Sequence, residues 1–207
     1  MSRLAALAAM LVFCAQTLAA PEAAARLGVL LQGMRQIEAD FHQTLLDEHD
    51  EVLQESAGRV VLQHPGRFRW ETRSPFEQLV VSDGASVWQY DADLQQVVIR
   101  PLDRRADQVP SLLLSGEIEQ VNRLYEISLL TGDAGVERFE LLPRDPGGPF
   151  ASLVIQFRDA VLERLEIADG MGQRTMVLFD AVHTIAKADE SLFVFVTPDG
   201  VDELHDE

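Results

Sequence analysis

The chain has almost no cysteine or lysine, and several catalytic motifs are missing. Cys14 is the only cysteine among 207 residues and Lys187 is the only lysine. One thiol cannot form an intramolecular disulfide, and a thiolate metal site needs several. The sequence has no Gly-x-Ser-x-Gly elbow, Ser-x-x-Lys pair, P-loop, Gly-x-Gly-x-x-Gly loop or His-Glu-x-x-His pair. We therefore expect a protein that is not an enzyme, has no catalytic residues and binds neither cofactor nor metal.

Positive charge is also scarce. Seventeen lysines and arginines face 34 aspartates and glutamates, giving a formal net charge of −17 and a pI of about 4.6. Nucleic-acid binding depends on clustered cations that neutralise phosphates, and the arginines here are scattered along the chain. The same balance disfavours charge-driven docking on anionic lipid.

Long apolar runs are absent after the N-terminus, so we expect no membrane span. At the N-terminus, Arg3 precedes the apolar residues 4–13 and a stretch of small residues. This order is typical of a signal peptide, which we place at residues 1–19 with cleavage after Ala19 or Ala20. Bulky Phe13 precedes Cys14 where a lipidation signal needs a small residue. We therefore predict export, with the thiol removed, and one domain spanning residues 20–207.

The acidic run 47–51 contains His49 and could ligate a metal, but the solvated tip of a hairpin explains it better. The five histidines are scattered. A carboxylate pair for glycoside hydrolysis stays open, because spacing in sequence does not fix distance in space. No such pair can be identified from the sequence.

Apolar spacing divides the chain into one helix and a series of strands. Apolar residues recur every three or four positions over residues 21–41, which predicts an amphipathic helix. The period then changes to two, and turn signals follow about every ten residues. Residues 101–123 break the pattern, and 111–115 resemble a short helical turn. The predicted strands are 41–46, 58–64, 67–72, 78–82, 86–90, 95–100, 125–130, 135–142, 151–158, 161–168, 173–179 and 192–197.

This pattern predicts an α+β, mainly β fold with about eleven strands in a single domain. So many antiparallel strands with one long helix indicate a strongly curved sheet, an unclosed antiparallel β-barrel. We expect the N-terminal helix and short lid helices to cover its concave face.

The stretch GRFRWETR, residues 66–73, alternates arginines with aromatic residues. In a strand, Phe68 and Trp70 point to one face while Arg67, Arg69 and Arg73 point to the other. The arginines then form the solvated face of the strand. Whether the aromatic face belongs to a packed core or to a lined pocket stays open at this level.

Several motifs resemble the LolA family of periplasmic outer-membrane lipoprotein carriers. They are HPGRFRWE at 64–71, PFEQLVVSDG at 75–84, VWQYDADLQQV at 87–97, GQRT at 172–175 and FVFVTPDGVD at 193–202. The resemblance implies an unclosed barrel whose concave face holds the acyl chains of a lipoprotein. It implies three partners: the cargo lipoproteins, an inner-membrane ABC transporter that releases them, and an outer-membrane receptor lipoprotein. A monomer in the periplasm without catalytic residues or bound nucleotide is expected.

The resemblance also implies site residues. Where the family usually has an arginine that helps close a lid over the cavity, this chain has His64. Imidazole offers fewer donors than guanidinium, so lid closure is expected to be weaker or to depend on pH near neutrality. Leu112, Leu113 and Leu114 are expected to form either the lid or a core plug that does not move. The expected acyl-cavity residues are Phe68, Trp70, Leu79, Val81, Trp88, Tyr90, Ile155 and Phe157.

Two other functions remain compatible with the same fold. A periplasmic sensor could bind a lipid or protein signal and regulate a membrane partner, although such sensors normally carry a second domain. The outer-membrane receptor of the same pathway would need a lipidated cysteine, which the surroundings of Cys14 do not favour.

Overall fold

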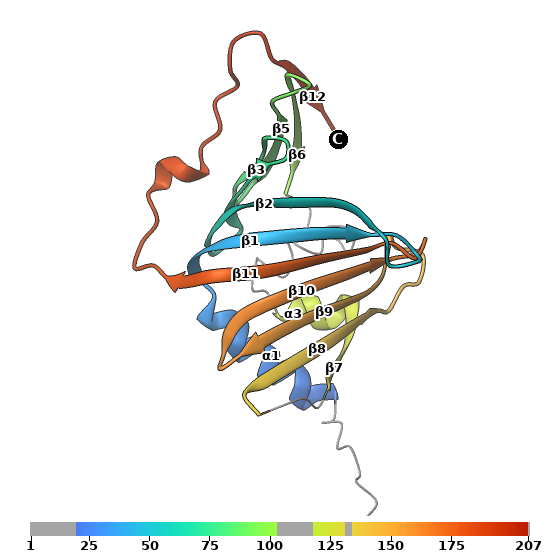
Figure 1. Ribbon diagram of the computed structural model, residues 1–207. Coiled ribbons are helices and arrows are strands. Elements are labelled where there is room, and N and C mark those ends of the chain that lie inside the picture. The colour runs from blue at the N-terminus through green and yellow to red at the C-terminus, as the bar shows by residue number, and fades with distance from the viewer. Residues whose placement is uncertain (1–19, 103–117, 131–133, 207) are drawn as a thin grey trace, which may run out of the picture.

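The computed structural model describes residues 20–102, 118–130 and 134–206 (Figure 1). Within these ranges, twelve strands form one sheet in the order β12-β6-β5-β4-β3-β2-β1-β11-β10-β9-β8-β7. The sheet does not close on itself, because β12 and β7 stand at opposite edges. The strands are β1 Gln36–Leu46, β2 Val52–Gln63, β3 Arg67–Ser74, β4 Gln78–Asp83, β5 Ser86–Asp91, β6 Gln96–Pro101, β7 Tyr125–Leu130, β8 Val136–Pro143, β9 Phe150–Arg158, β10 Val161–Asp169, β11 Arg174–Thr184 and β12 Asp202–His205.

The described helices are few and short. They are α1 (Ala20–Gly33), α3 (Ile118–Leu124) and the 3-10 turn η2 (Glu190–Phe193). No helix among the described residues is long and apolar enough to cross a bilayer. The prediction of a mainly β, unclosed sheet with helices against it is confirmed.

The N-terminal helix is shorter than predicted. It ends at Gly33, and Ile37 and Phe41, expected on its apolar stripe, lie instead in β1. Residues four apart share a face both in a helix and in a strand, so these two positions fit either period. The buried alternation of Ile37, Ala39 and Phe41 shows that the period of two already begins here.

The C-terminal prediction also needs correction. The predicted strand at residues 192–197 is absent; η2 and a non-repetitive segment occupy that region. The last strand is β12, which contains His205 and was not predicted. It pairs with β6 in parallel, whereas every other pair in the sheet is antiparallel. Strands whose side chains are all exposed leave no period-two signal in the sequence.

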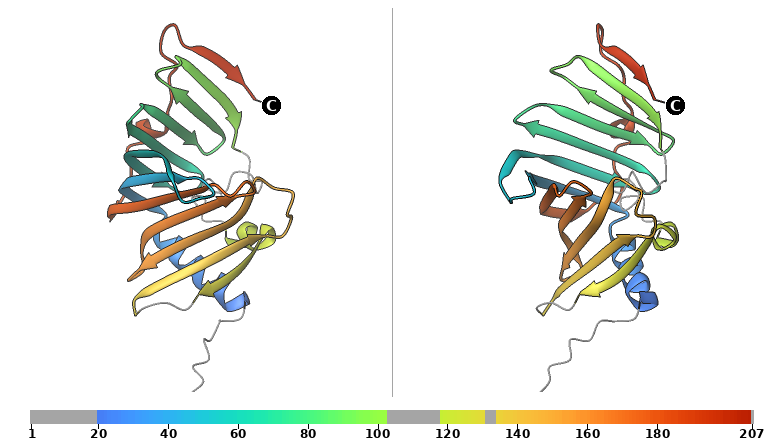
Figure 2. Two further views of the ribbon diagram at one scale, coloured as in Figure 1. Left: turned by 45° about the vertical axis from the view of Figure 1, so that its right-hand side comes forward. Right: turned by 90° about the vertical axis from the view of Figure 1, so that its right-hand side faces the viewer.

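We call the sheet face that carries Phe68 and Trp70 the inner face and the opposite one the outer face. Helix α1 packs on the inner face beside β7 and α3, behind the half of the sheet formed by β7–β11 (Figures 1 and 2). The buried helix residues Leu27, Leu30 and Leu31 join the side chains of the inner face in one cluster. This cluster is the main hydrophobic core.

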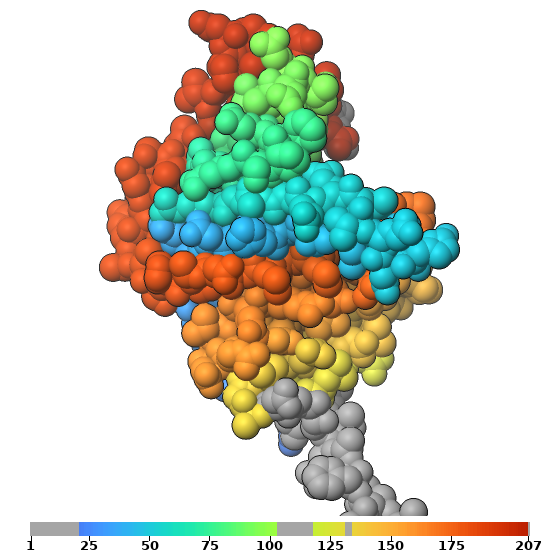
Figure 3. Space-filling model, in the orientation of Figure 1, coloured from blue at the N-terminus to red at the C-terminus, as the bar shows by residue number. Residues whose placement is uncertain are grey.

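The outer face is built differently along the sheet. Over β1 and β7–β11 the strands form a continuous surface (Figure 3), and α1 lies behind these strands in the same orientation (Figure 1). Around β2–β4 the chain segment after β11 lies on this face, and η2 contacts β3 and β4. Val61, Ala188 and Phe193 form a second, smaller buried cluster there. The C-terminal segment therefore gives part of the outer face its own core.

Candidate functional site

The inner face carries an aromatic group with side chains from β3, β1 and β11; β2 lies between β3 and β1 in the sheet. The ring of Trp70 lies 4.2 Å from that of Phe41 and 6.3 Å from that of Phe179, the second pair being edge to face. Phe68 is 6% exposed and lies in the same cluster. Phe41 and Phe179 are opposite each other in the β1–β11 pairing. Neither Phe41 nor Phe179 was among the predicted cavity residues, because only the pairing of β1 with β11 shows that the two lie opposite each other.

Ile155 and Phe157 occupy the inner face farther along the sheet. Both are on β9 and almost fully buried, and the ring of Phe157 meets that of Phe139 edge to face at 6.2 Å. They belong to the same cluster as Phe68 and the apolar side of α1. Four predicted cavity residues, Phe68, Trp70, Ile155 and Phe157, therefore share one continuous apolar face.

The other four predicted cavity residues lie on the outer face. In the pairing of β3 with β4, Trp70 is opposite Val80, whereas Leu79 is opposite Glu71 and Val81 opposite Arg69. Strand β5 continues this register, with Tyr90 opposite Leu79 and Trp88 opposite Val81. Cross-strand partners share a sheet face, so Leu79, Val81, Trp88 and Tyr90 point away from Phe68 and Trp70.

On the outer face, one of these residues contacts the C-terminal segment and another is buried. The ring of Tyr90 lies 5.7 Å from that of Phe195, and Val81 is completely buried. Alternation within a strand does not say how that strand is registered against the next one. On β4 the inner apolar side chain is Val80, which packs against the main core.

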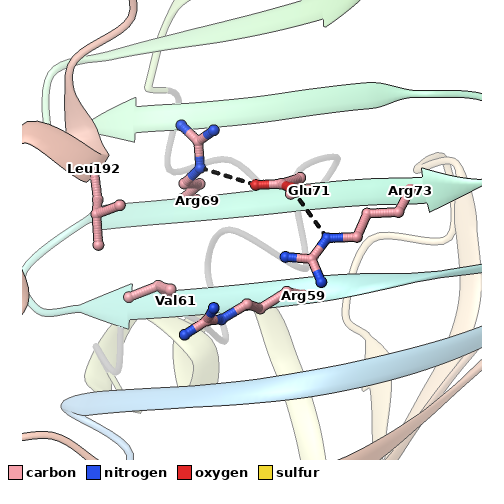
Figure 4. Close-up of a pocket in the computed structure, with 6 residues that line it drawn as sticks. All are labelled: Arg59, Val61, Arg69, Glu71, Arg73 and Leu192. Carbon is pink, nitrogen blue, oxygen red and sulfur yellow. Dashed lines mark hydrogen bonds and ion pairs between the residues drawn. The ribbon is translucent and has the colours of Figure 1, made fainter.

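The arginines of GRFRWETR lie on the outer face, as their alternation predicted. Arg69 and Arg73 line a small pocket of about 100 Å³, together with Arg59, Val61, Glu71 and Leu192 (Figure 4). Glu71 accepts hydrogen bonds from Nε of Arg69 at 3.3 Å and of Arg73 at 3.1 Å. Burial opposes ionisation of Glu71, but the hydrogen bonds and charges of Arg73 and Arg69 outweigh it and lower its pKa. This cluster is an ion-pair network along a single strand, β3, and its pocket is smaller than a typical ligand site.

The predicted lid can be placed only in part. Leu112, Leu113 and Leu114 lie outside the described residues. His64 sits in the turn between β2 and β3, where its N–H donates to the carbonyl of Arg35 at 2.8 Å. It lines an open depression of about 500 Å³ that also includes Pro65, Arg67 and Asp83.

The acidic turns are explained by their own backbone. Asp47 accepts hydrogen bonds from the N–H groups of Glu51 at 2.9 Å and His49 at 2.8 Å, which lower its pKa. Asp91 accepts from the N–H groups of Leu94 and Asp93 in the same way. Among the described residues, no group of three or more His, Cys, Asp or Glu side chains could hold a metal ion. Both carboxylates thus stabilise hairpin turns.

Comparison with known proteins agrees with this arrangement. The family model described as "Outer membrane lipoprotein carrier protein LolA" matches residues 32–196. The outer-membrane lipoprotein carrier protein of Chromohalobacter salexigens is 41% identical over 183 residues, covering 88% of this chain and 87% of that protein. The carrier of Azotobacter vinelandii is 40% identical over 181 residues, covering 87% of each chain.

A solved structure supports the fold alone. The crystal structure of an uncharacterized conserved protein from Thermus thermophilus superposes with a TM-score of 0.54 at 15% identity, covering 88% of this chain and 99% of that one. The family match extends from the end of α1 past η2, and so includes every strand except β12. The chain therefore belongs to the LolA family of outer membrane lipoprotein carrier proteins.

Proposed function

We propose that this protein binds the acyl chains of lipoproteins on the inner face of its sheet and carries them across the periplasm. The observation that carries the proposal is the continuous apolar inner face, combined with about 40% identity to curated carriers over most of the chain. Phe68, Trp70, Ile155 and Phe157 are the proposed acyl-contacting residues. The sensor function has no comparable support and is not favoured.

The energetics explain why such a carrier is needed. Burying one methylene group is worth about 0.8 kcal/mol, so a ~16-carbon chain exposed to water costs on the order of 12 kcal/mol. An acylated protein therefore leaves a membrane at a useful rate only if another apolar surface receives its chains. A sheet that does not close can provide such a surface, because its two edges can separate without breaking hydrogen bonds between strands.

The proposed partners follow from the family. An inner-membrane ABC transporter would deliver the cargo, and an outer-membrane receptor lipoprotein would accept it. The carrier itself would act as a monomer and a chaperone, without catalysing a reaction. In this proposal His64 and the segment containing Leu112, Leu113 and Leu114 would close the cavity.

A release assay tests the proposal. Purified residues 20–207 would be added to energised inner-membrane vesicles that contain the cognate transporter and labelled lipoproteins. We expect soluble lipoprotein–carrier complexes with the unchanged protein and at least ten-fold fewer with Phe68→Glu, because a carboxylate would then lie in the apolar face. Phe76→Glu is the matched control, since Phe76 lies in the turn after the same strand and is 58% exposed.

Folding of each variant would be checked by circular dichroism and thermal melting. If Phe68→Glu fails to fold, Phe68→Leu serves as a second variant. It keeps the site apolar and should retain release of lipoproteins. Failure of the unchanged protein to release lipoproteins would contradict the carrier function. Equal release by the Phe68→Glu and Phe76→Glu variants would place the acyl chains elsewhere.

A further inference from the structure

The inner face changes character between β3 and β6. Across the sheet, Phe68 is opposite Ser82, Ser82 is opposite Val87, and Val87 is opposite Arg100. Because cross-strand partners share a face, these four side chains form one row on the inner face. The row begins with the aromatic side chain of β3 and ends with a guanidinium on β6.

The neighbouring row on the inner face is mixed. Trp70 on β3 is opposite Val80 on β4, Val80 is opposite Gln89 on β5, and Gln89 is opposite Val98 on β6. Trp70 and Val80 pack against the main core, whereas Gln89 is exposed. The inner face is therefore apolar at β3, whereas toward β6 it also carries the polar side chains of Gln89 and Arg100.

Arg100 is half-buried, and its Nε atom is fully buried without a hydrogen-bond partner. No ion pair joins it to any carboxylate among the described residues. Asp91 shares its face, but the amide of Gln78 and the turn N–H groups of Asp93 and Leu94 already occupy that carboxylate. A guanidinium is always charged and carries five donors, so a buried unpaired donor is destabilising unless a ligand supplies an acceptor.

Arg164 can be compared with Arg100 in its burial and in its partners. Its Nε is also buried without a partner, but its Nη2 donates to Glu166 at 2.8 Å and contacts the sulfur of Met176 at 2.9 Å. It is opposite Leu178 on β11, while its neighbour Leu165 lies in the main core, so Arg164 points to the outer face. Of these two arginines, only Arg100 is on the cargo side and has no anionic partner.

We propose that Arg100 binds the oxygen-rich end of the acylated cargo, namely the ester carbonyls that join the acyl chains to the glyceryl group. This inference rests on the proposed carrier function and adds an orientation to it. The chains would run from β6 toward Phe68 and Trp70, across three strand spacings or roughly 14 Å. A ~16-carbon chain is long enough to cross that distance and reach the aromatic group. The position of Arg100 would then fix which end of the cargo lies at the β6 side.

The test compares two probes that differ only in the carbonyl oxygens. One is a short synthetic lipopeptide with two ester-linked palmitoyl chains, and the other is its ether-linked analogue. Titration calorimetry on residues 20–207 is expected to give about ten-fold tighter binding of the ester probe, the effect of one charge-assisted hydrogen bond. In Arg100→Met the preference should fall below about two-fold, with binding of the ether probe unchanged. Arg164→Met, the matched control, should keep the full preference.

The outcomes separate the inference from the function beneath it. If neither probe binds to the unchanged protein, the proposed carrier function fails. If both probes bind equally well, or if Arg100→Met keeps the ester preference, the carrier function stands and the assignment of Arg100 is wrong. Thermal melting without lipid adds an independent measurement. We expect Arg100→Met to melt at or above the temperature of the unchanged protein, and a marked fall would make Arg100 a structural residue and overturn the inference.

Discussion

Gly58 allows the aromatic group of the inner face to form. It lies on β2 opposite Phe41 of β1. A Cβ atom at this position would lie 1.9 Å from the carbonyl oxygen of Glu71 and 2.8 Å from Cζ of Phe41. The backbone of Glu71 and the ring of Phe41 both lie too close to Gly58 for any side chain to fit there. The contact of Phe41 with Trp70 therefore depends on a residue without a side chain.

Gly58→Ala is expected to lower the free energy of unfolding by about 1–3 kcal/mol, the usual cost of forcing extra atoms into a packed core. Urea denaturation with tryptophan fluorescence would report both the stability and the surroundings of Trp70. Gly33→Ala is the control, since nothing lies within 4 Å of that position and alanine favours a helix. Equal stability of the Gly58 variant and the unchanged protein would contradict this prediction. It would show that β2 and β3 move apart at little cost in free energy.

At the scale of elements, one ion pair joins α1 to the sheet. Arg26 donates from Nε and Nη2 to the two carboxylate oxygens of Glu137 on β8, each at 2.6 Å. The hydrogen bond from Arg26 lowers the pKa of Glu137 below its ordinary value of 4.5, more than burial raises it. Since the Arg26 side chain is 43% exposed, solvent screens much of this interaction.

Glu137→Gln is expected to reduce the free energy of unfolding by about 0.5–1 kcal/mol at neutral pH. A lowered carboxylate pKa stabilises the folded state above the unfolded-state value, and this contribution is lost as pH falls through the folded-state value. The difference between variant and unchanged protein should therefore persist from pH 8 to about pH 5, shrink as pH falls below the ordinary value of 4.5, and be lost once pH is below the lowered pKa of Glu137 in the folded state. Chemical denaturation at each pH would measure it, with Glu140→Gln on the same strand as control. A difference that grows as pH falls would contradict this assignment.

Most elements could be predicted because their strands alternate buried and exposed side chains. The prediction failed where the alternation is ambiguous, as at Ile37 and Phe41, or absent, as in β12. The prediction also failed to show which residues of neighbouring strands share a sheet face. Phe68 and Trp70 were correctly placed together, but no local pattern shows that Val80, rather than Val81, shares their face. That relation depends on the pairing register of β3 and β4.

The inner-face residues could be predicted only in part for a similar reason. Ile155 and Phe157 join Phe68 only because β1 pairs with β11, which brings the two halves of the chain into one sheet. Arg100 could not be recognised from sequence, since its significance lies in a missing partner. A charged residue in a strand is ordinarily solvated, and only the three-dimensional arrangement shows that its Nε is not.

For the whole molecule, the net charge of −17 implies repulsion among carboxylates over the surface. Raising NaCl from about 10 mM to about 0.3 M shortens the screening distance below roughly 10 Å. We expect the melting temperature to rise by a few degrees, which corresponds to about 1 kcal/mol for a chain of this size. Differential scanning calorimetry would measure it. The effect should shrink near the pI of 4.6, and a melting temperature that falls with salt would show that ion pairs outweigh repulsion.

The strand order has a consequence for how the chain reaches this structure. Strands β1–β6 and β7–β11 are two meanders of neighbouring hairpins, and a single seam between β1 and β11 joins them, with Ile37 opposite Thr184. Hairpins close quickly, whereas contacts between distant residues form slowly because a long loop must first be ordered. During synthesis, the edge of β1 therefore stays unpaired until β11 has been made and can pair with it. The seam should be the late step of folding, and a chain that stops before β11 keeps an aggregation-prone edge.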